Sequence, residues 1–402
     1  MRTQYVVIAA LIAAGTAASS QSREPEWPQY LGPSRNGNAT MAIPASARLS
    51  VGWRKPLPSG SAGIVVGNGQ AYTLGSDGEH DVLLAFDAAS GNETWRVVLG
   101  PTHADSALGP GSTPVLVGDL VVAIATGCRM QAVNRQTRAV AWTFDFGAEF
   151  SSPLVKRGGC NMSPLVAGSK VIFTTGAPDK RLAAVDTSTG RVMWTAAVLP
   201  SYGGSAGWLS DDGGTILYHH VKQQPEASGI TAIDPESGAI RWQIDGTGGA
   251  SGTAPVQIEK GRVLIERWPH ASLYDLTTRK AVWTTPDMTA QENPAVHHKG
   301  HLYGFGGQSG EFLTCLDAST GQLKWSSRIY RGHLALAGET LVVLANAAGV
   351  LRLVTPDPAG YRELTKVDVL RPGARTPTPP TVASGHIFVR NYEEIVAVKV
   401  GG

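Results

Sequence analysis

A turn followed by a tryptophan recurs six times along the chain, and this repeat constrains the fold more than any other feature. In most copies an apolar run ends in Asp, a polar turn follows, and a Trp comes eight residues after the Asp. The copies read LLAFDAASGNETW, MQAVNRQTRAVAW, LAAVDTSTGRVMW, ITAIDPESGAIRW, SLYDLTTRKAVW and TCLDASTGQLKW. Their tryptophans are spaced by 47, 52, 48, 41 and 42 residues. A period of about 40 to 50 residues indicates a solenoid or a propeller.

Each repeat predicts a small antiparallel sheet. The Asp side chain can accept hydrogen bonds from backbone N–H groups of the turn. Glycine can adopt the positive φ angle that such a turn needs, and it occurs there as Gly91, Gly190, Gly238 and Gly321. Two further strands precede each motif, as in TPVLVGD and LVVAIAT (113–126). A four-stranded sheet cannot bury both of its faces alone, so neighbouring repeats must stack.

The two ends of the repeat region predict a closed ring. Residues 349–370 form a degenerate unit without a Trp, and the last unit, ending at 393–400, lacks its outer strand. The segment VGWRKPL (51–57) supplies the missing pattern. We therefore predict an all-β fold, an eight-bladed β-propeller of four-stranded antiparallel blades whose terminal strands share one blade. Seven blades is the alternative if the degenerate unit merges with a neighbour. Closure would remove two exposed sheet edges.

The repeated tryptophans are predicted to be structural wedges between blades rather than ligand platforms. An indole can bury on the order of 200 Å². Six repeated copies would not each form a cofactor site. The predicted wedges are Trp53, Trp95, Trp142, Trp194, Trp242, Trp283 and Trp325.

The N-terminus predicts export. Arg2 precedes an apolar run over residues 6–14 and small residues over 15–20, which is typical of a signal peptide (1–21). The run is too short for a spanning helix, the alternative interpretation. No Cys lies near the cleavage point, so we expect a soluble periplasmic or extracellular protein without a lipid anchor. The predicted organisation is a Pro/Gly-rich leader packed on the ring (22–50) followed by the propeller (51–402).

Composition and cysteine content narrow the function classes. A net charge of +2 without a basic stripe gives no reason to expect nucleic acid. Only 16% of residues are charged and 48 are Gly, which favours short strands and tight turns. The three cysteines form no CxxC motif, so zinc and c-type haem lack their usual signatures. Cys128 and Cys160 lie on connectors expected to share one face, so a disulfide between them is a hypothesis, with free thiols as the alternative.

The motif resembles that of a known family. AAVDTSTGRVMW and AIDPESGAIRW are similar to the pyrroloquinoline-quinone (PQQ)-like repeat of quinoprotein-type propellers, Ala-x-Asp-x-x-Thr/Ser-Gly-x-x-x-Trp, and the resemblance covers about residues 51–400. The family implies a propeller but includes both quinone-dependent alcohol dehydrogenases and the non-enzymatic outer-membrane assembly propeller BamB. The segment WPQYLGPSRNG (27–37) resembles the start of secreted bacterial propellers with this repeat. It is interpreted as part of the leader, with a ligand-contacting loop at Arg35 and Asn36 as the alternative.

The catalytic signatures of the dehydrogenase branch are not found. The resemblance would call for an adjacent Cys pair beside the quinone, which is missing, and its calcium-binding residues do not map onto this sequence. The histidines of VHHKGH (296–301) and of YHH (218–220) are interpreted as surface-hairpin residues, with metal binding as the alternative. Adjacent residues of a strand point to opposite faces, so two neighbouring histidines cannot both bind one metal ion unless they lie in a turn. We expect no cofactor and no chemistry of its own, with PQQ and calcium as the alternative.

Ligand-binding candidates are predicted on the connectors between blades. These connectors run from one blade's outer strand to the next blade's inner strand and should open onto one face around the channel. If Arg331 and Arg375 converge, a carboxylate ligand would be favoured; solvated loop polarity is the alternative. The candidates are His103, Asp105, Glu149, Tyr202, Glu292, Arg331, His333 and Arg375.

The predicted function is an exported, monomeric propeller scaffold. It would bind an envelope or secreted protein or peptide, for example by β-augmentation, or a small polar ligand. The alternative is a PQQ- or metal-dependent oxidoreductase of the quinoprotein dehydrogenase type. A carbohydrate-processing or sensing propeller is a third hypothesis, although no paired carboxylates stand out. The sequence leaves the partner, the ligand and the oligomeric state open.

Overall fold

A computed structural model describes most of the chain after the predicted signal peptide. The described residues are 26–106, 108–152, 160–200, 206–210, 214–220, 228–246, 253–289, 293–307, 310–345, 348–373 and 375–402. The predicted signal peptide lies outside them. Within the described ranges, no helix has the length and apolar character needed to cross a membrane.

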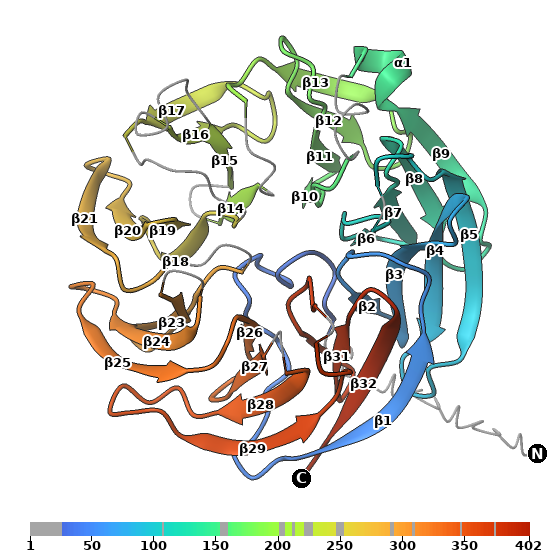
Figure 1. Cartoon of the computed structure of the whole chain (residues 1–402). Coiled ribbons are helices and arrows are strands. Elements are labelled where there is room, and N and C mark those ends of the chain that lie inside the picture. Colours follow the sequence, from blue (N-terminus) through green and yellow to red (C-terminus); the bar gives the residue numbers. More distant parts are fainter. Residues whose placement is uncertain are drawn as a thin grey trace, which may run out of the picture.

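Eight four-stranded antiparallel sheets form a ring (Figure 1). This confirms the predicted eight-bladed propeller and excludes the seven-bladed alternative. The only helix in the described part of the chain is the single-turn α1 (Phe146–Phe150). The blades are numbered 1 to 8, and the strands of each are given from inner to outer. Blade 1 is β2 (Val65–Gly67), β3 (Gln70–Ser76), β4 (His80–Asp87) and β5 (Glu93–Pro101); blade 2 is β6 (Val115–Val117), β7 (Leu120–Ile124), β8 (Arg129–Asn134) and β9 (Val140–Asp145); blade 3 is β10 (Leu165–Ala167), β11 (Lys170–Thr174), β12 (Leu182–Asp186) and β13 (Val192–Ala196); and blade 4 is β14 (Gly207–Leu209), β15 (Thr215–His220), β16 (Gly229–Ile233) and β17 (Ile240–Ile244). Blade 5 is β18 (Val256–Glu259), β19 (Arg262–Arg267), β20 (His270–Asp275) and β21 (Lys280–Thr285); blade 6 is β22 (Val296–His298), β23 (His301–Gly306), β24 (Phe312–Asp317) and β25 (Leu323–Arg328); blade 7 is β26 (Gly332–Leu336), β27 (Leu341–Ala345), β28 (Val350–Val354) and β29 (Glu363–Asp368); and blade 8 is β30 (Thr381–Ala383), β31 (His386–Arg390), β32 (Glu394–Gly401) and β1 (Arg48–Pro56).

The two ends of the chain meet in blade 8. Strand β1 pairs antiparallel with β32 from Arg48 opposite Gly401 to Pro56 opposite Glu394, with a register shift between Val51 and Trp53. The N-terminal strand is therefore the outer strand of a blade whose other three strands end the chain. It begins at Arg48, slightly before the predicted end of the leader at residue 50.

Burial along the strands follows the stacking of the blades. The second strands are buried on both faces, as in β11, where all five residues are buried. Outer strands alternate: in β9, Trp142 and Phe144 are buried while Ala141 and Thr143 are exposed. A period of two is expected for a strand with one covered face. The core thus consists of apolar layers between neighbouring blades.

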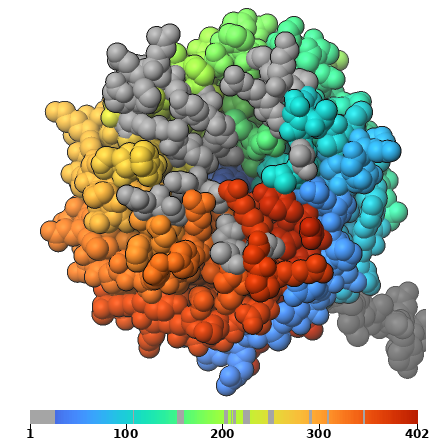
Figure 2. Space-filling view, in the orientation of Figure 1, coloured from blue at the N-terminus to red at the C-terminus, as the bar shows by residue number. Residues whose placement is uncertain are grey.

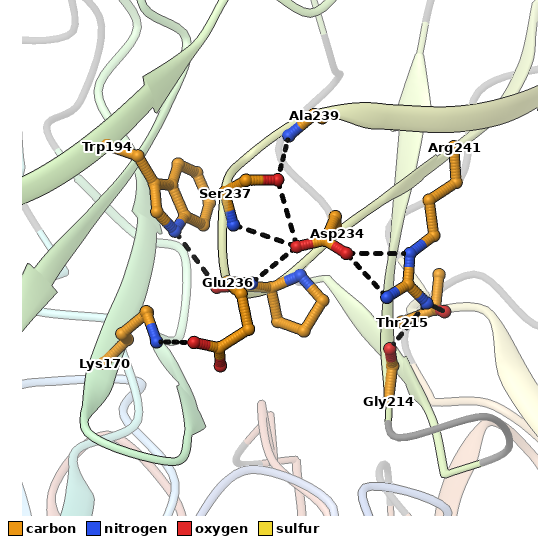
Figure 3. Close-up of polar contacts among 10 residues, drawn as sticks. Lys170, Trp194, Gly214, Thr215, Asp234, Glu236, Ser237, Ala239 and Arg241 are labelled. Carbon is orange, nitrogen blue, oxygen red and sulfur yellow. Dashed lines mark hydrogen bonds and ion pairs between the residues drawn. The ribbon is translucent and has the colours of Figure 1, made fainter.

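The turn between the third and fourth strands is held by its Asp. In blade 4, the Asp234 carboxylate accepts hydrogen bonds from the backbone N–H groups of Glu236 (2.8 Å) and Ser237 (2.9 Å), and Arg241 donates to its other oxygen at 2.7 Å (Figure 3). The guanidinium of Arg241 and these N–H groups lower the pKa of Asp234 to about 2. The Asp of the repeat is therefore used locally, to shape the turn.

Five of these turns also accept a hydrogen bond from the tryptophan of the preceding blade. The indole nitrogen of Trp194 donates to the Pro235 carbonyl at 3.0 Å, and the neighbouring Lys170 ammonium lies 2.6 Å from a Glu236 carboxylate oxygen (Figure 3). Three other tryptophans donate to the equivalent position of the next turn, at 2.9 to 3.0 Å: Trp53 to Ala88, Trp142 to Thr187, and Trp283 to Ala318. Trp325 donates at 2.8 Å to Asp357, one residue further along the degenerate turn. The wedge tryptophans are buried or half-buried, so they lie between blades.

Two turns depart from this arrangement because they have Arg in place of Gly. Arg138 and Arg279 take up positive φ angles of 66° and 57°. The tryptophans that face them, Trp95 and Trp242, do not donate to the backbone of these turns, which are fully described. In the regular turns the glycine lies directly on the indole: a Cβ on Gly91 would come within 2.3 Å of the Trp53 ring. A side chain at this position therefore prevents the indole from docking.

Candidate functional site

The leader closes one end of the central channel. Trp27 exchanges backbone hydrogen bonds with Val66 of β2 at 2.9 Å in both directions, and Leu116 of β6 donates to Pro28. On the far side of the ring, Leu336 of β26 donates to Gly37 and its carbonyl accepts from Ala39. The blue segment behind the centre of the ring is this leader, which crosses from blades 1 and 2 to blade 7 (Figure 1).

Arg35 anchors the leader inside the channel. Its side chain is 1% exposed and donates to the Ala206 carbonyl at 2.8 Å and to the Pro164 carbonyl at 3.0 Å, with Gln29 Oε1 at 3.3 Å. Ala206 and Pro164 directly precede the inner strands of blades 4 and 3. Burial lowers the pKa of Arg35 to about 10, so it stays cationic near neutral pH. The donors of Arg35 are thus committed to the fold, and the alternative that this side chain contacts a ligand is not supported.

The opposite end of the channel carries the connectors, and we call it the connector face. Because the strands are antiparallel, the hairpins between second and third strands lie on this same face. The space-filling view looks along the ring axis, and a small blue area at its centre marks the leader (Figure 2). The connector face therefore surrounds one end of the channel, and the leader lies at the other end.

The structure places the predicted candidates at different depths of this face. Asp105 and Glu149 are exposed, and His103 is half-buried with its Nδ1 accepting from the Asp105 backbone at 3.2 Å. Glu149 lies in α1, which Asp145 caps through the Gly147 and Ala148 N–H groups. Tyr202 and Glu292 lie outside the described residues. Among the described residues these candidates do not form one cluster: His103 and Asp105 share the connector into blade 2, and Glu149 lies on the next one.

The arginine-bearing connectors of blades 7 and 8 are adjacent. His333 is fully buried, and its Nε2 lies 2.8 Å from the Thr376 carbonyl oxygen. Arg331 and Arg375, both exposed, lie within two residues of these partners. His333 is therefore a bridge between connectors, and the ligand-binding role predicted for the two arginines stays a prediction.

Blades 4 and 5 hold a group of buried polar residues. It includes His219 and His220, which lie buried in a strand rather than in the predicted surface hairpin, and Glu266 and Arg267, which were not among the predicted site residues. His219 and His220 end β15, and Glu266 and Arg267 end β19, all beneath the connector face. His220 contacts Thr231 Oγ1 and Asp245 Oδ1, each at 2.9 Å. The sequence signals are a polar pair that closes an otherwise apolar strand in each blade, TILYHH in blade 4 and RVLIER in blade 5.

The charges of this group are set by burial. Burial raises the pKa of Glu266 to about 8, although its Oε2 accepts from the Ala295 N–H at 2.6 Å. Burial, together with the charge of Arg267, lowers the pKa of His219 to about 3. At neutral pH both groups are therefore mainly uncharged. Arg267, whose pKa is lowered by burial to about 10, stays charged.

Cys128 and Cys160 form a disulfide with Cα atoms 5.1 Å apart. It joins the β7–β8 hairpin to the connector that leads into blade 3. Cys315 is a free thiol buried in β24. Within the described ranges, no group of three or more His, Cys, Asp or Glu residues could hold a metal ion.

These observations define the class of protein: a closed β-propeller built from quinoprotein-type repeats, with one end of its channel filled by its own leader. Residues 79–327 match a family model described as outer membrane protein assembly factor BamB, and the chain belongs to this family.

The curated relatives come from both branches. A dehydrogenase subunit of alcohol dehydrogenase (quinone) from Acetobacter aceti is 26% identical over 159 residues, which cover 37% of this chain and 21% of the relative. Outer membrane protein assembly factor BamB from Shewanella oneidensis is 26% identical over 145 residues, which cover 36% of this chain and 32% of the relative. The chain thus matches only about a fifth to a third of the length of these relatives.

Solved structures show the same fold. BamB from Moraxella catarrhalis has a TM-score of 0.62 at 15% identity, covering 88% of this chain and 100% of that one. Quinohemoprotein alcohol dehydrogenase from Comamonas testosteroni has a TM-score of 0.70 at 15% identity, covering 95% and 81%. At such low identity the likeness concerns the fold alone.

The described residues do not fit the quinone and calcium that the dehydrogenase branch implies. The disulfide joins cysteines 32 positions apart rather than an adjacent pair. The buried Arg390, a cation that could pair with a quinone carboxylate, instead donates to backbone carbonyls, among them Gly60 at 2.6 Å and Leu74 at 2.7 Å. We therefore derive no redox step through a quinone.

Proposed function

We propose that this propeller is an exported envelope scaffold that binds a protein or peptide on its connector face and has no chemistry of its own. One observation carries the proposal: large apolar side chains are exposed on this face. Trp268, in the β19–β20 hairpin, is 54% exposed, and Tyr330, in the connector after β25, is 53% exposed.

These residues have the composition of a protein-binding surface. Arg328 lies over the Tyr330 ring, 4.9 Å from its centroid, and contacts its hydroxyl group. Exposed aromatic residues combined with arginine are enriched in interfaces and dominate their binding energy. The family description, an outer membrane protein assembly factor, supports a protein partner in the cell envelope. The rigid ring would hold the connectors in place.

Site-specific photo-crosslinking in the source organism tests the proposal. A photoreactive residue at position 330 or 268 should give a defined crosslinked product. The same residue at Val192, which is exposed on the outer strand β13, should not. Products that do not differ between the rim positions and position 192 would reject the proposal.

The competing oxidoreductase function needs its own test. The similarity to alcohol dehydrogenase (quinone) is the observation that favours it. The purified exported protein would be incubated with PQQ and calcium and examined by absorbance and mass spectrometry. Stoichiometric quinone binding with dye reduction by alcohols would support the enzyme and contradict the scaffold.

A further inference from the structure

A cavity of about 420 Å³ opens between the leader and blades 4 and 5, away from the connector face. Its volume lies at the low end of the range for small-molecule sites. Its lining includes Ser34 and Asn36 of the leader, Trp208 of β14, Glu259 of β18, and Lys260 of the following turn. The proposed protein-binding function does not use this cavity.

The leader side of the cavity is held in place by the anchor described above. Ser34 and Asn36 flank Arg35, whose guanidinium is bonded to carbonyls of blades 3 and 4. The Asn36 side-chain oxygen also accepts from the Asn38 backbone at 3.1 Å. A ligand would therefore meet groups that are already ordered, which lowers the entropic cost of binding.

An indole forms one wall. Trp208 is half-buried and packs with the apolar layer between blades 3 and 4. Gly214 lies against its ring, where a Cβ would come within 2.3 Å of Cζ2. The indole is thus fixed between this packing and the cavity. An indole presents a large apolar surface that suits the C–H face of a saturated ring.

The polar lining offers both donors and acceptors. Asn36 uses its oxygen locally, which leaves its amide N–H₂ group as a donor. Lys260 is exposed and forms no ion pair with any described residue. Glu259 Oε1 accepts from Arg262 at 2.9 Å, which leaves Oε2 as an acceptor. Arg262 already offsets part of the Glu259 charge, and the Lys260 ammonium adds a positive charge beside it.

We propose that this cavity binds a neutral saccharide of one or two rings. Ring hydroxyl groups would donate to Glu259 and accept from Asn36 and Lys260, while a C–H face would stack on Trp208. A cationic ligand would be repelled by the Lys260 ammonium, and an anionic ligand would meet the remaining oxygen of Glu259, Oε2. A neutral polyhydroxylated ring uses donors and acceptors of both kinds without that repulsion.

Saturation-transfer-difference NMR and calorimetry with glucose, galactose, N-acetylglucosamine and maltose test the proposal on the full mature chain. At least one of these probes should bind. Asn36→Ala and Lys260→Ala should each weaken its binding about tenfold, a loss of about 1.4 kcal/mol. Asn92→Ala and Lys366→Ala are matched controls at exposed positions outside the cavity and should change the affinity less than twofold.

The role of the indole is tested by a graded pair. Trp208→Phe should retain part of the binding and Trp208→Ala should abolish it, with folding checked by circular dichroism. Three results would overturn the proposal: no probe binds the wild-type protein, the Asn36 and Lys260 variants bind as the controls do, or zwitterionic glycine or alanine displaces the saccharide.

Discussion

The indole nitrogen of Trp53 donates to the carbonyl oxygen of Ala88 at 3.0 Å, and Gly91 of the same turn lies flat against the indole ring. Trp53 belongs to the blade that closes the ring, and the turn belongs to blade 1. One side chain thus joins the strand that completes blade 8 to the neighbouring blade. This relationship, repeated around the ring, gives the first two predictions.

Gly91→Ala should destabilise the protein more than Gly69→Ala. Both glycines have φ +71°, so both substitutions cost about 1 kcal/mol in backbone strain. A Cβ at Gly69 meets no atom within 4 Å, whereas at Gly91 it would lie 2.3 Å from the Trp53 ring. We expect an additional loss of about 1–3 kcal/mol for Gly91→Ala, measured by urea denaturation. Equal losses would show that the indole contact contributes nothing.

Arg138→Gly should stabilise the protein. It relieves a positive φ of 66° on a residue with a Cβ, worth about 1 kcal/mol, and makes room for Trp95 to dock on the turn. Arg279→Gly should gain less, because Arg279 lies over the Trp242 ring at 6.0 Å and that contact is lost. Thermal unfolding of the two variants gives the comparison, and a lower midpoint for Arg138→Gly would contradict the explanation.

The repeat predicted the fold because its residues make the contacts between neighbouring blades, and blades that are neighbours in the ring are also consecutive in the sequence. The degenerate unit also forms a full four-stranded blade, and its Tyr361 packs edge-on against Trp325 with ring centroids 6.1 Å apart. The site was harder to predict. Arg35 is 129 and 171 residues from its carbonyl partners, and the burial of Glu266 depends on the next blade. A repeating pattern in the sequence cannot predict these pairings, because they join positions that the repeat does not relate.

The stability of the wild-type protein should contain a pH-dependent contribution from Glu266. Its pKa rises from an ordinary 4.5 to about 8 in the folded state because of burial. The folded state therefore prefers the protonated form, and the contribution is complete below about pH 4.5 and is lost as the pH rises through about 8. Glu266→Gln should remove it, so the variant gains stability relative to wild type between pH 5 and pH 8. The contribution of His219 to stability falls toward acid pH, but His219 is present in both proteins, so its effect cancels in the difference between them. A pH-independent difference between the two proteins would refute this assignment.

Reduction of the Cys128–Cys160 disulfide should lower the unfolding midpoint. The cross-link closes a loop over a sequence separation of 32, which corresponds to about 3–4 kcal/mol in the chain-entropy model. The Cys128→Ser/Cys160→Ser double variant should start lower and not respond to reductant, while Cys315→Ser should respond like wild type. Alkylation of the unfolded, unreduced protein should label one thiol, Cys315; three labelled thiols would contradict the pairing.

Arg35→Ala should release the leader from the channel. The substitution leaves the Ala206 and Pro164 carbonyls without their donor in a buried place, at a cost of about 2–4 kcal/mol. Arg35→Lys should recover only part of the lost stability, because an ammonium group cannot reach both carbonyls as the wide guanidinium group does. Arg96→Ala, which removes an exposed ion pair with Glu93, is the control and should cost less than about 1 kcal/mol. Limited proteolysis followed by mass spectrometry should show faster cleavage within residues 26–47 only in the Arg35 variants.

Because Ser34 and Asn36 line the cavity beside Trp208, these variants should also lose saccharide binding while the ring stays folded. Unchanged cleavage of the leader in Arg35→Ala would mean that the backbone pairing of Trp27 and Gly37 holds this segment without its central side chain.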